Sequence, residues 1–242
     1  MKTLVVTIVT RGEDWDTLQE TQKQELTKWL RRYDKNSSEY AQALKTVKNS
    51  TGLSPATGSV VAIGVKDVTQ ETGIVYTTLT NECVTGIPDT WQVRIGDEAT
   101  VLSWFWGGVT RYRVLVSFSG RSFALPFLAH RAVRYDITPA RSFLGARRII
   151  EQQAPYHVDM QDELSFYGAM RKRPSLSLWC QTYGISSKAV QTDVPTIEDW
   201  CTKNDTTALA EHVVAKVEAT DALYQRWCAH LAPAGWSTGR WS

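Results

Sequence analysis

The order of apolar and polar positions predicts an α/β chain that opens on a buried strand. Residues 4–9, LVVTIV, form an unbroken apolar and β-branched run, which is typical of a central strand. Two further apolar runs, residues 59–65 and 72–78, are separated by a polar turn and predict a hairpin. Residues 113–118 predict one more buried strand. A sheet of at least four strands follows from these runs.

Helical periodicity accounts for most of the remaining chain. Helices are expected over residues 17–33, 37–48, 97–106, 123–134, 176–183 and 206–230. The third of these should end at the pair Gly107-Gly108, and residues 158–167 should form a short edge strand or turn. Because one strand is followed by a turn and then a helix, the sheet is expected to be partly parallel.

Composition narrows the class of protein. The 242 residues are 43% hydrophobic and 21% charged with 15 Gly and 8 Pro, which excludes collagen-like and disordered chains. The four cysteines form no CxxC pair, so neither a zinc knuckle nor a compact disulfide framework is expected. The apolar run near the start is far shorter than the roughly 18 residues that cross a bilayer, and no signal-peptide cleavage pattern follows it. A cytoplasmic protein without a membrane partner is therefore expected.

Three segments in chain order carry a resemblance to a known family. They are VVTIVT at residues 5–10, VSFSGRSFALP at 116–126 and HVVAKV at 212–217. HVDMQD at 157–162 and PSLSLW at 174–179 add to it. Together they resemble the DNA polymerase B exonuclease-like family of the DEDD superfamily of 3′-to-5′ exonucleases.

The resemblance implies an α/β fold with an RNase H-like mixed sheet flanked by helices. It covers nearly the whole chain, so we expect a single domain over residues 1–235 with 36–56 as a candidate insertion. Residues 236–242 are expected as a C-terminal tail, in which Trp236 and Trp241 either are exposed and anchor a partner or fold back on the body of the domain.

The residues at the metal-binding positions of the family differ from its pattern. The resemblance places the four metal-binding carboxylates at Thr7, Val9, Ala124 and Lys216, and the tyrosine of the last motif at His212. None of the four residues is acidic, although the family works with a pair of Mg²⁺ or Mn²⁺ ions that need oxygen ligands. Two-metal hydrolysis at this site, a bound metal and any other cofactor are therefore not expected.

Acidic residues elsewhere leave an alternative open. Asp159 with Asp162, or Glu211 with Glu218, could rebuild a metal site, since their spacing can bring carboxylates together on local structure. The simpler interpretation is that they are solvated surface acids.

Nucleic-acid binding could remain without the metal, because phosphate contacts do much of the positioning. The net charge of +2 requires no acidic partner, so the argument rests on local clusters, of which residues 121–148 and 171–173 are the most basic. Lys216 could contact a phosphate directly or pair with Glu211 or Glu218. The candidate nucleic-acid-binding residues are Arg11, Ser119, Arg121, Arg131, Arg147, Arg148 and Lys216.

Three functional hypotheses follow. The first is a catalytically degenerate exonuclease-like domain that binds nucleic acid, expected to be single-stranded, or acts as a scaffold for protein subunits of a nucleic-acid-processing complex. The second is an active metal-dependent 3′-to-5′ exonuclease with a relocated site. The third is a protein-protein interaction module.

Overall fold

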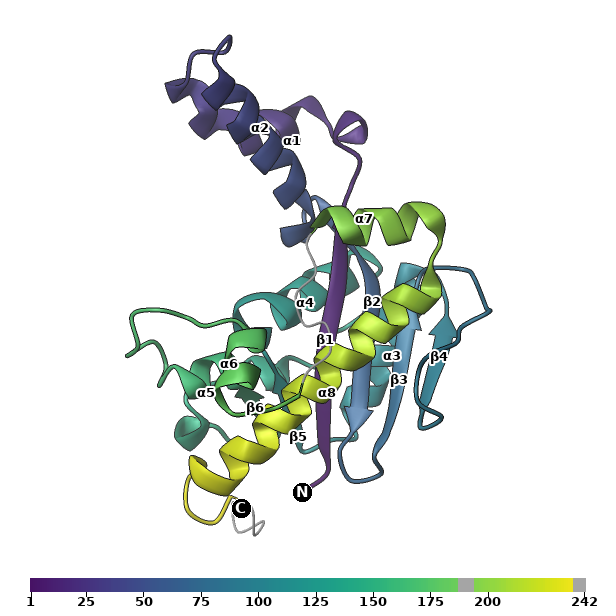
Figure 1. Ribbon diagram of the computed structural model, residues 1–242, viewed down its shortest axis with the longest axis vertical. Helices are drawn as coiled ribbons and strands as arrows, with labels where there is room; N and C mark the ends of the chain where they lie inside the picture. Colours follow the sequence, from purple (N-terminus) through teal and green to yellow (C-terminus); the bar gives the residue numbers. More distant parts are fainter. Residues whose placement is uncertain (187–193, 237–242) are drawn as a thin grey trace.

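A mixed six-stranded sheet lies between two layers of helices (Figure 1). The computed structural model describes residues 1–186 and 194–236. The strand order is β4-β3-β2-β1-β5-β6. The pairs β1–β2 and β2–β3 are antiparallel, whereas β1–β5, β5–β6 and β3–β4 are parallel. The first strand of the chain is therefore central, as its apolar run predicted.

The described residues form six strands and eight α-helices. The strands are β1 (Thr3–Gly12), β2 (Gly58–Asp67), β3 (Thr72–Thr77), β4 (Trp91–Ile95), β5 (Val114–Ser117) and β6 (Tyr156–Asp159). The helices are α1 (Glu20–Thr27), α2 (Ser38–Ser50), α3 (Glu98–Val109), α4 (Leu125–Arg134), α5 (Met160–Leu164), α6 (Leu176–Thr182), α7 (Val194–Lys203) and α8 (Thr206–His230). A π-helical turn, Gly120–Ala124, joins β5 to α4.

Side-chain alternation along β1 divides the interior into two cores. Val5 and Val9 face the core covered by α5, α6 and α8, whereas Leu4, Val6 and Ile8 face the core covered by α3 and α4. Both faces of the strand are buried, which explains its unbroken apolar sequence.

The long helix α8 crosses the sheet in close contact with its central strands (Figure 1). Gly64 on β2 permits this approach, because a Cβ at that position would lie 2.3 Å from Cγ1 of Val213 and 3.0 Å from Cγ2 of Val217. Thr7 is the register partner of Gly64 on β1. The third turn of α8, which carries Lys216, therefore lies over the middle of β1.

Three sequence predictions of secondary structure are wrong. The helix expected over residues 17–33 is divided, because α1 ends at Thr27 and residues 28–32 form a 3-10 turn. Helix α3 continues through Gly107-Gly108 to Val109, because burial of the Val109 side chain holds the last turn against the core. Residues 158–167 are not an edge strand or turn alone: β6 ends at Asp159, which caps α5 by accepting a hydrogen bond from the backbone of Gln161. Strand β4 and helix α7 were not predicted.

A helical arm projects from the end of β1 (Figure 1). The arm consists of residues 13–57, which include α1 and α2, and is therefore wider than the candidate insertion at 36–56. Its base is tight: a Cβ on Gly52 would lie 2.7 Å from the backbone nitrogen of Gly12.

The expected C-terminal tail begins inside the core. Trp236 is 1% exposed and its indole N–H donates to the Tyr224 hydroxyl at 3.1 Å, so it is not an exposed anchor. Trp241 lies outside the described residues. None of the described helices is both long and apolar enough to cross a membrane.

Candidate functional site

A pocket of about 200 Å³ opens where β1 ends, between the arm and α8. Val9 of β1 and Phe123 of the π-helical turn are among the residues that line it. The full lining is Ile8, Val9, Thr10, Arg11, Gly12, Asn49, Gly52, Leu53, Phe123, Ile197, His212 and Lys216. The lining contains two cationic side chains, one histidine and no carboxylate. We call this cavity the β1 pocket.

Lys216 is the cation on the α8 side of the β1 pocket, and its side chain is half-buried. Within residues 1–186 and 194–236 its ammonium has no ion-pair or hydrogen-bond partner, because Glu218 instead pairs with Lys66 at 2.6 Å. Burial lowers the pKa of the Lys216 ammonium. The salt bridge to Glu211 or Glu218 considered from the sequence is therefore not formed.

His212 lies one turn before Lys216 on the same face of α8. Its ring is buried, 5.4 Å from the ring of Trp200 on α7. Both His212 and Lys216 line the β1 pocket, so the helical spacing places a ring and a charge side by side. Arg11 lies on the strand side of the pocket and is exposed, which leaves it accessible from solvent.

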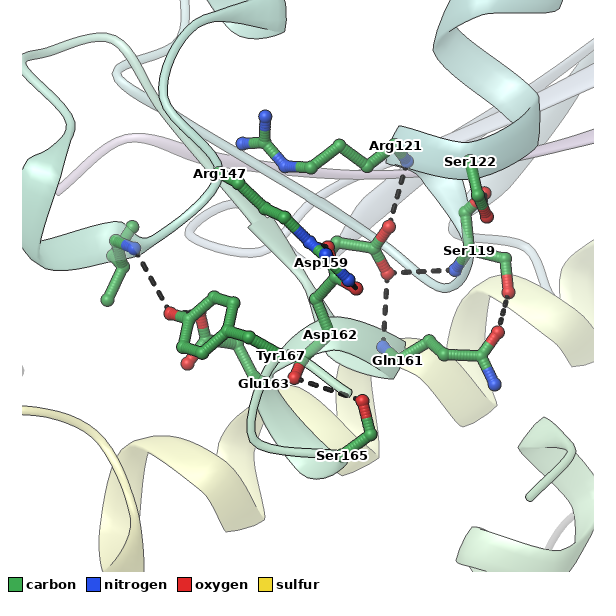
Figure 2. Close-up of polar contacts among 11 residues, drawn as sticks. Ser119, Arg121, Ser122, Arg147, Asp159, Gln161, Asp162, Glu163, Ser165 and Tyr167 are labelled. Carbon is green, nitrogen blue, oxygen red and sulfur yellow. Dashed lines mark hydrogen bonds and ion pairs between the residues drawn. The ribbon is translucent and has the colours of Figure 1, made fainter. Parts of the chain in front are cut away.

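The turn after β5 is fixed by the carboxylate of Asp159 (Figure 2). Backbone N–H groups of Ser119 and Arg121 donate to it at 2.9 and 2.8 Å, and that of Gln161 donates at 3.0 Å. Burial raises the pKa of Asp159, and the three donors oppose this rise. Ser119 has a left-handed backbone with φ of 60°, and its hydroxyl donates to the Gln161 side chain. Ser119 is therefore held in a local network.

Close packing requires a glycine at position 120, in the middle motif. A Cβ on Gly120 would lie 2.0 Å from Oγ of Ser117, which is hydrogen bonded to Nε2 of His157 at 2.8 Å. Burial, together with the nearby charge of Arg121, lowers the pKa of His157 to about 3. The imidazole is neutral at pH 7, so this pair is a buried support under the turn.

The side chain of Arg121 also stabilises the turn after β5. Its Nη1 donates to the carbonyl of Gly145 at 3.0 Å and its Nη2 to the carbonyl of His157 at 3.3 Å. Its guanidinium therefore ties the turn to the segment before β6, and Figure 2 shows it beside Arg147.

Arg147 forms a two-point ion pair with Asp162. Its Nε and Nη2 donate to the two carboxylate oxygens at 2.9 and 2.5 Å. Burial acts to raise the pKa of Asp162, but the hydrogen bonds and charge of Arg147 outweigh it and hold this pKa below its ordinary value. Both Asp159 and Asp162 are thus occupied by protein donors.

A family model described as a predicted 3′-5′ exonuclease related to the exonuclease domain of PolB matches residues 59–230. This match extends over more than half of the chain. The chain belongs to this family. Its membership confirms the resemblance carried by the motifs, although β1 precedes the matched residues.

Solved structures support the same fold. The chain is similar to the family B DNA polymerase from the hyperthermophilic archaeon Pyrobaculum calidifontis, with a TM-score of 0.51 and 16% sequence identity. The similarity covers 94% of this chain but 24% of the polymerase, so the chain spans about a quarter of that protein. No curated protein matches. The expected α/β mixed sheet flanked by helices is confirmed.

The positions that the PolB-exonuclease resemblance assigns to carboxylates do not fit a pair of divalent ions. Val9 and Ala124 are buried apolar residues, and Thr7 lies beneath α8. Lys216 brings a positive charge to the β1 pocket, which repels a divalent cation. Within the described parts of the chain, no three His, Cys, Asp or Glu side chains come together as a metal site.

Arg131 does not line the β1 pocket. It is 3% exposed, and its Nε and Nη2 donate to both carboxylate oxygens of Glu98 at 2.8 and 2.6 Å. Its Nη1 donates to the carbonyl of Pro55 at 3.2 Å. Because each nitrogen has a protein acceptor, Arg131 is a structural residue, and its place in the basic stretch of sequence was misleading.

The structure thus brings two of the seven candidate nucleic-acid residues, Arg11 and Lys216, into one pocket. Arg147 and Arg148 are exposed but do not line it. Sequence reasoning missed Phe123 and Ile197 as walls of the β1 pocket. Phe123 directly precedes Ala124, a position that the resemblance assigned to the site, so the sequence did indicate that this part of the chain lies near it. Nothing in the sequence around Ile197 indicated that α7 would cover the pocket.

Proposed function

We propose that this PolB-exonuclease-related domain binds single-stranded nucleic acid at the β1 pocket without cutting it, as a subunit of a nucleic-acid-processing complex. One observation carries the proposal: the pocket is lined by Lys216 and Arg11 and by no carboxylate. A phosphate group matches this lining in charge, because both cations donate to oxygen and neither has a neutralising acid in the pocket.

The state of Lys216 favours an anionic ligand. A half-buried ammonium without an acceptor is costly, since burial removes water without supplying a partner. A phosphate oxygen placed in the β1 pocket would supply that partner. His212 and Phe123 add ring faces to the walls, against which a sugar or base can pack.

The exposed cations around β6 supply a second, weaker contact. Arg148 is 59% exposed on its side chain and has one loose ion pair, to Glu151 at 3.7 Å. Residues 171–173, sequence RKR, are exposed. Such charges attract a phosphate backbone at long range and strengthen binding at low salt. Ser119, Arg121 and Arg131 are not part of this proposed surface, because their polar groups hold the fold together.

A relocated nuclease site is not favoured. Asp159 accepts three backbone N–H groups and Asp162 is paired with Arg147, so metal binding would first have to break these contacts.

The four cysteines are free thiols, which is typical of a reducing compartment and supports a cytoplasmic location.

Binding of a fluorescent single strand at several salt concentrations tests the proposal. The unaltered chain should bind more tightly as salt falls, and Lys216→Met should weaken binding and reduce the slope of log affinity against log salt by about 0.7. Lys45→Met removes an exposed cation from α2 and is the matched control.

The same preparation should leave the strand intact in Mg²⁺ or Mn²⁺. Metal-dependent shortening that is lost in Asp159→Asn and Asp162→Asn would instead establish the relocated site. A complete lack of binding at low salt would favour the protein-protein module.

A further inference from the structure

The far end of the arm presents a cluster of cations around an exposed aromatic ring. This arm tip consists of residues 28–35, sequence KWLRRYDK, in the connection between α1 and α2 (Figure 1). It holds four basic residues and one acid. All four cations, Lys28, Arg31, Arg32 and Lys35, are exposed.

Local packing directs these side chains outward. Residues 28–32 form a 3-10 turn in which Leu30 is 1% exposed and anchors the segment to the arm. Because a 3-10 turn has about three residues per turn, the neighbours of an inward residue face solvent. Trp29, which directly precedes Leu30, accordingly faces solvent and is 43% exposed.

The aromatic rings of the tip are held in place before any ligand binds. Trp29 and Tyr33 meet edge to face, with ring centroids 6.2 Å apart. The guanidinium of Arg32 lies 5.1 Å from both ring centroids. This arrangement limits the rotamers of an exposed tryptophan, so stacking on it costs less side-chain entropy.

Most of the positive charge of the tip has no acidic partner among the described residues. In the described parts of the chain, Arg31 and Lys35 have no acidic partner, and Lys28 alone is paired, with Glu25. The one acid, Asp34, accepts a hydrogen bond from the backbone N–H of Asn36 at 3.0 Å. The tip therefore combines free positive charge with a ring face.

We infer that the arm tip binds single-stranded nucleic acid, with phosphates on Arg31 and Lys35 and a base stacked on Trp29. Ring faces interleaved with cations are the usual means of holding a single strand without sequence preference. A protein or membrane partner would need a broader apolar face. The described arm offers no such face, since Trp29 and Leu53 are its exposed large apolar side chains and Leu53 lies at the base.

This inference rests on the proposed function for its geometry. The base of the arm lines the β1 pocket, and α2 has 13 residues, so the tip stands about 20 Å from the pocket. At about 3.4 Å per stacked nucleotide, a strand needs roughly six nucleotides to reach from one to the other. A strand that reaches both sites gains affinity through the higher effective concentration of the second contact.

The test compares a 4-nucleotide and a 16-nucleotide single strand by fluorescence anisotropy at low salt. For the longer strand, Arg31→Ala should weaken binding several-fold and lower the salt slope by about 0.7, and Trp29→Ala should weaken it by about tenfold. The preference for the longer strand should shrink in both variants. Trp29→Phe keeps a stacking ring and should bind nearly as the unaltered chain does.

Controls separate the tip from the pocket. Lys45→Ala removes an exposed cation from α2 outside the tip and should have little effect. Arg31 is exposed, so its variant reports on binding even where Trp29→Ala disturbs the arm. If both tip variants bind the long strand normally while Lys216→Met does not, the inference is overturned and the proposed function stands. If the tip variants lose affinity and Lys216→Met does not, the tip is supported and the β1 pocket proposal fails.

Discussion

The backbone N–H of Arg121 donates to the Asp159 carboxylate at 2.8 Å and thereby joins the turn after β5 to the end of β6. Residues 38 positions apart in sequence are linked at the point where two parallel strands end side by side. Motif positions 119–124 therefore depend for their conformation on one carboxylate in the HVDMQD segment.

Asp159→Asn should destabilise the fold by about 2–3 kcal/mol, because the amide nitrogen of asparagine would face a backbone N–H that now has an acceptor. Urea unfolding measures this loss. Asp89→Asn, at an exposed acid, is the control and should leave the midpoint unchanged. Equal midpoints for the two variants would contradict a structural role for the Asp159 carboxylate.

Arg131→Ala should destabilise the chain by about 3–5 kcal/mol, since it leaves Glu98 buried without its paired charge. The exposed Arg134 lies on the same helix, so Arg134→Ala is the matched control. Chemical denaturation gives both values. If Arg131→Ala instead has a normal unfolding midpoint and a lower dependence of strand affinity on salt, Arg131 belongs to the binding surface.

Glu163→Gln should remove a pH dependence of stability. Burial raises the pKa of Glu163 to about 7, against the hydrogen bond that it accepts from the Tyr167 hydroxyl. An unfolded glutamate has a pKa near 4.3. Because the folded state keeps the proton to a higher pH, stability is greatest below about pH 4 with respect to this group and falls as pH rises to about 7.

Thermal unfolding at pH 5 and pH 8 checks that sign. The melting temperature of Glu163→Gln should fall less between the two values than that of the unaltered chain, and the glutamine carbonyl can still accept from Tyr167. Glu39→Gln, at an exposed position, should change nothing. A steeper fall in Glu163→Gln than in the unaltered chain would mean that the carboxylate, not the carboxylic acid, is the form favoured by folding.

Lys216→Arg should preserve strand binding at alkaline pH. Burial lowers the pKa of Lys216, so its ammonium loses the proton at a lower pH than an exposed lysine does. Affinity of the unaltered chain for an adenine-only strand should therefore decline over a pH range below the one in which an exposed lysine loses its proton. The guanidinium stays charged throughout this range and removes the decline. Parallel profiles for the two proteins would indicate that Lys216 does not touch the strand.

The sequence predicted the secondary structure correctly where one physical requirement determines which residues a segment can contain. The run at residues 4–9 is apolar on both faces because helices cover both faces of β1, so its place in the centre of the sheet could be predicted. Helix α8 was predicted with its observed ends, since Asp205 caps its start and apolar positions recur along it. The family motifs located the turn after β5.

Contacts between distant segments could not be predicted. Arg131 belongs to a basic stretch, and only the fold shows that Glu98 on α3 neutralises it. Lys66 on β2 likewise pairs with Glu218, one of the two acids that the sequence offered as a partner of Lys216. Each case depends on which of several opposite charges the tertiary structure brings within reach.

The base of the arm also affects how the chain can be re-engineered. Gly12 and Gly58 are register partners on adjacent antiparallel strands, so the arm leaves and re-enters the sheet at one point. A short turn could close the hairpin there without altering the order of the strands. The arm is in this sense a graftable module, and the same junction could accept a different recognition segment while the sheet keeps its topology.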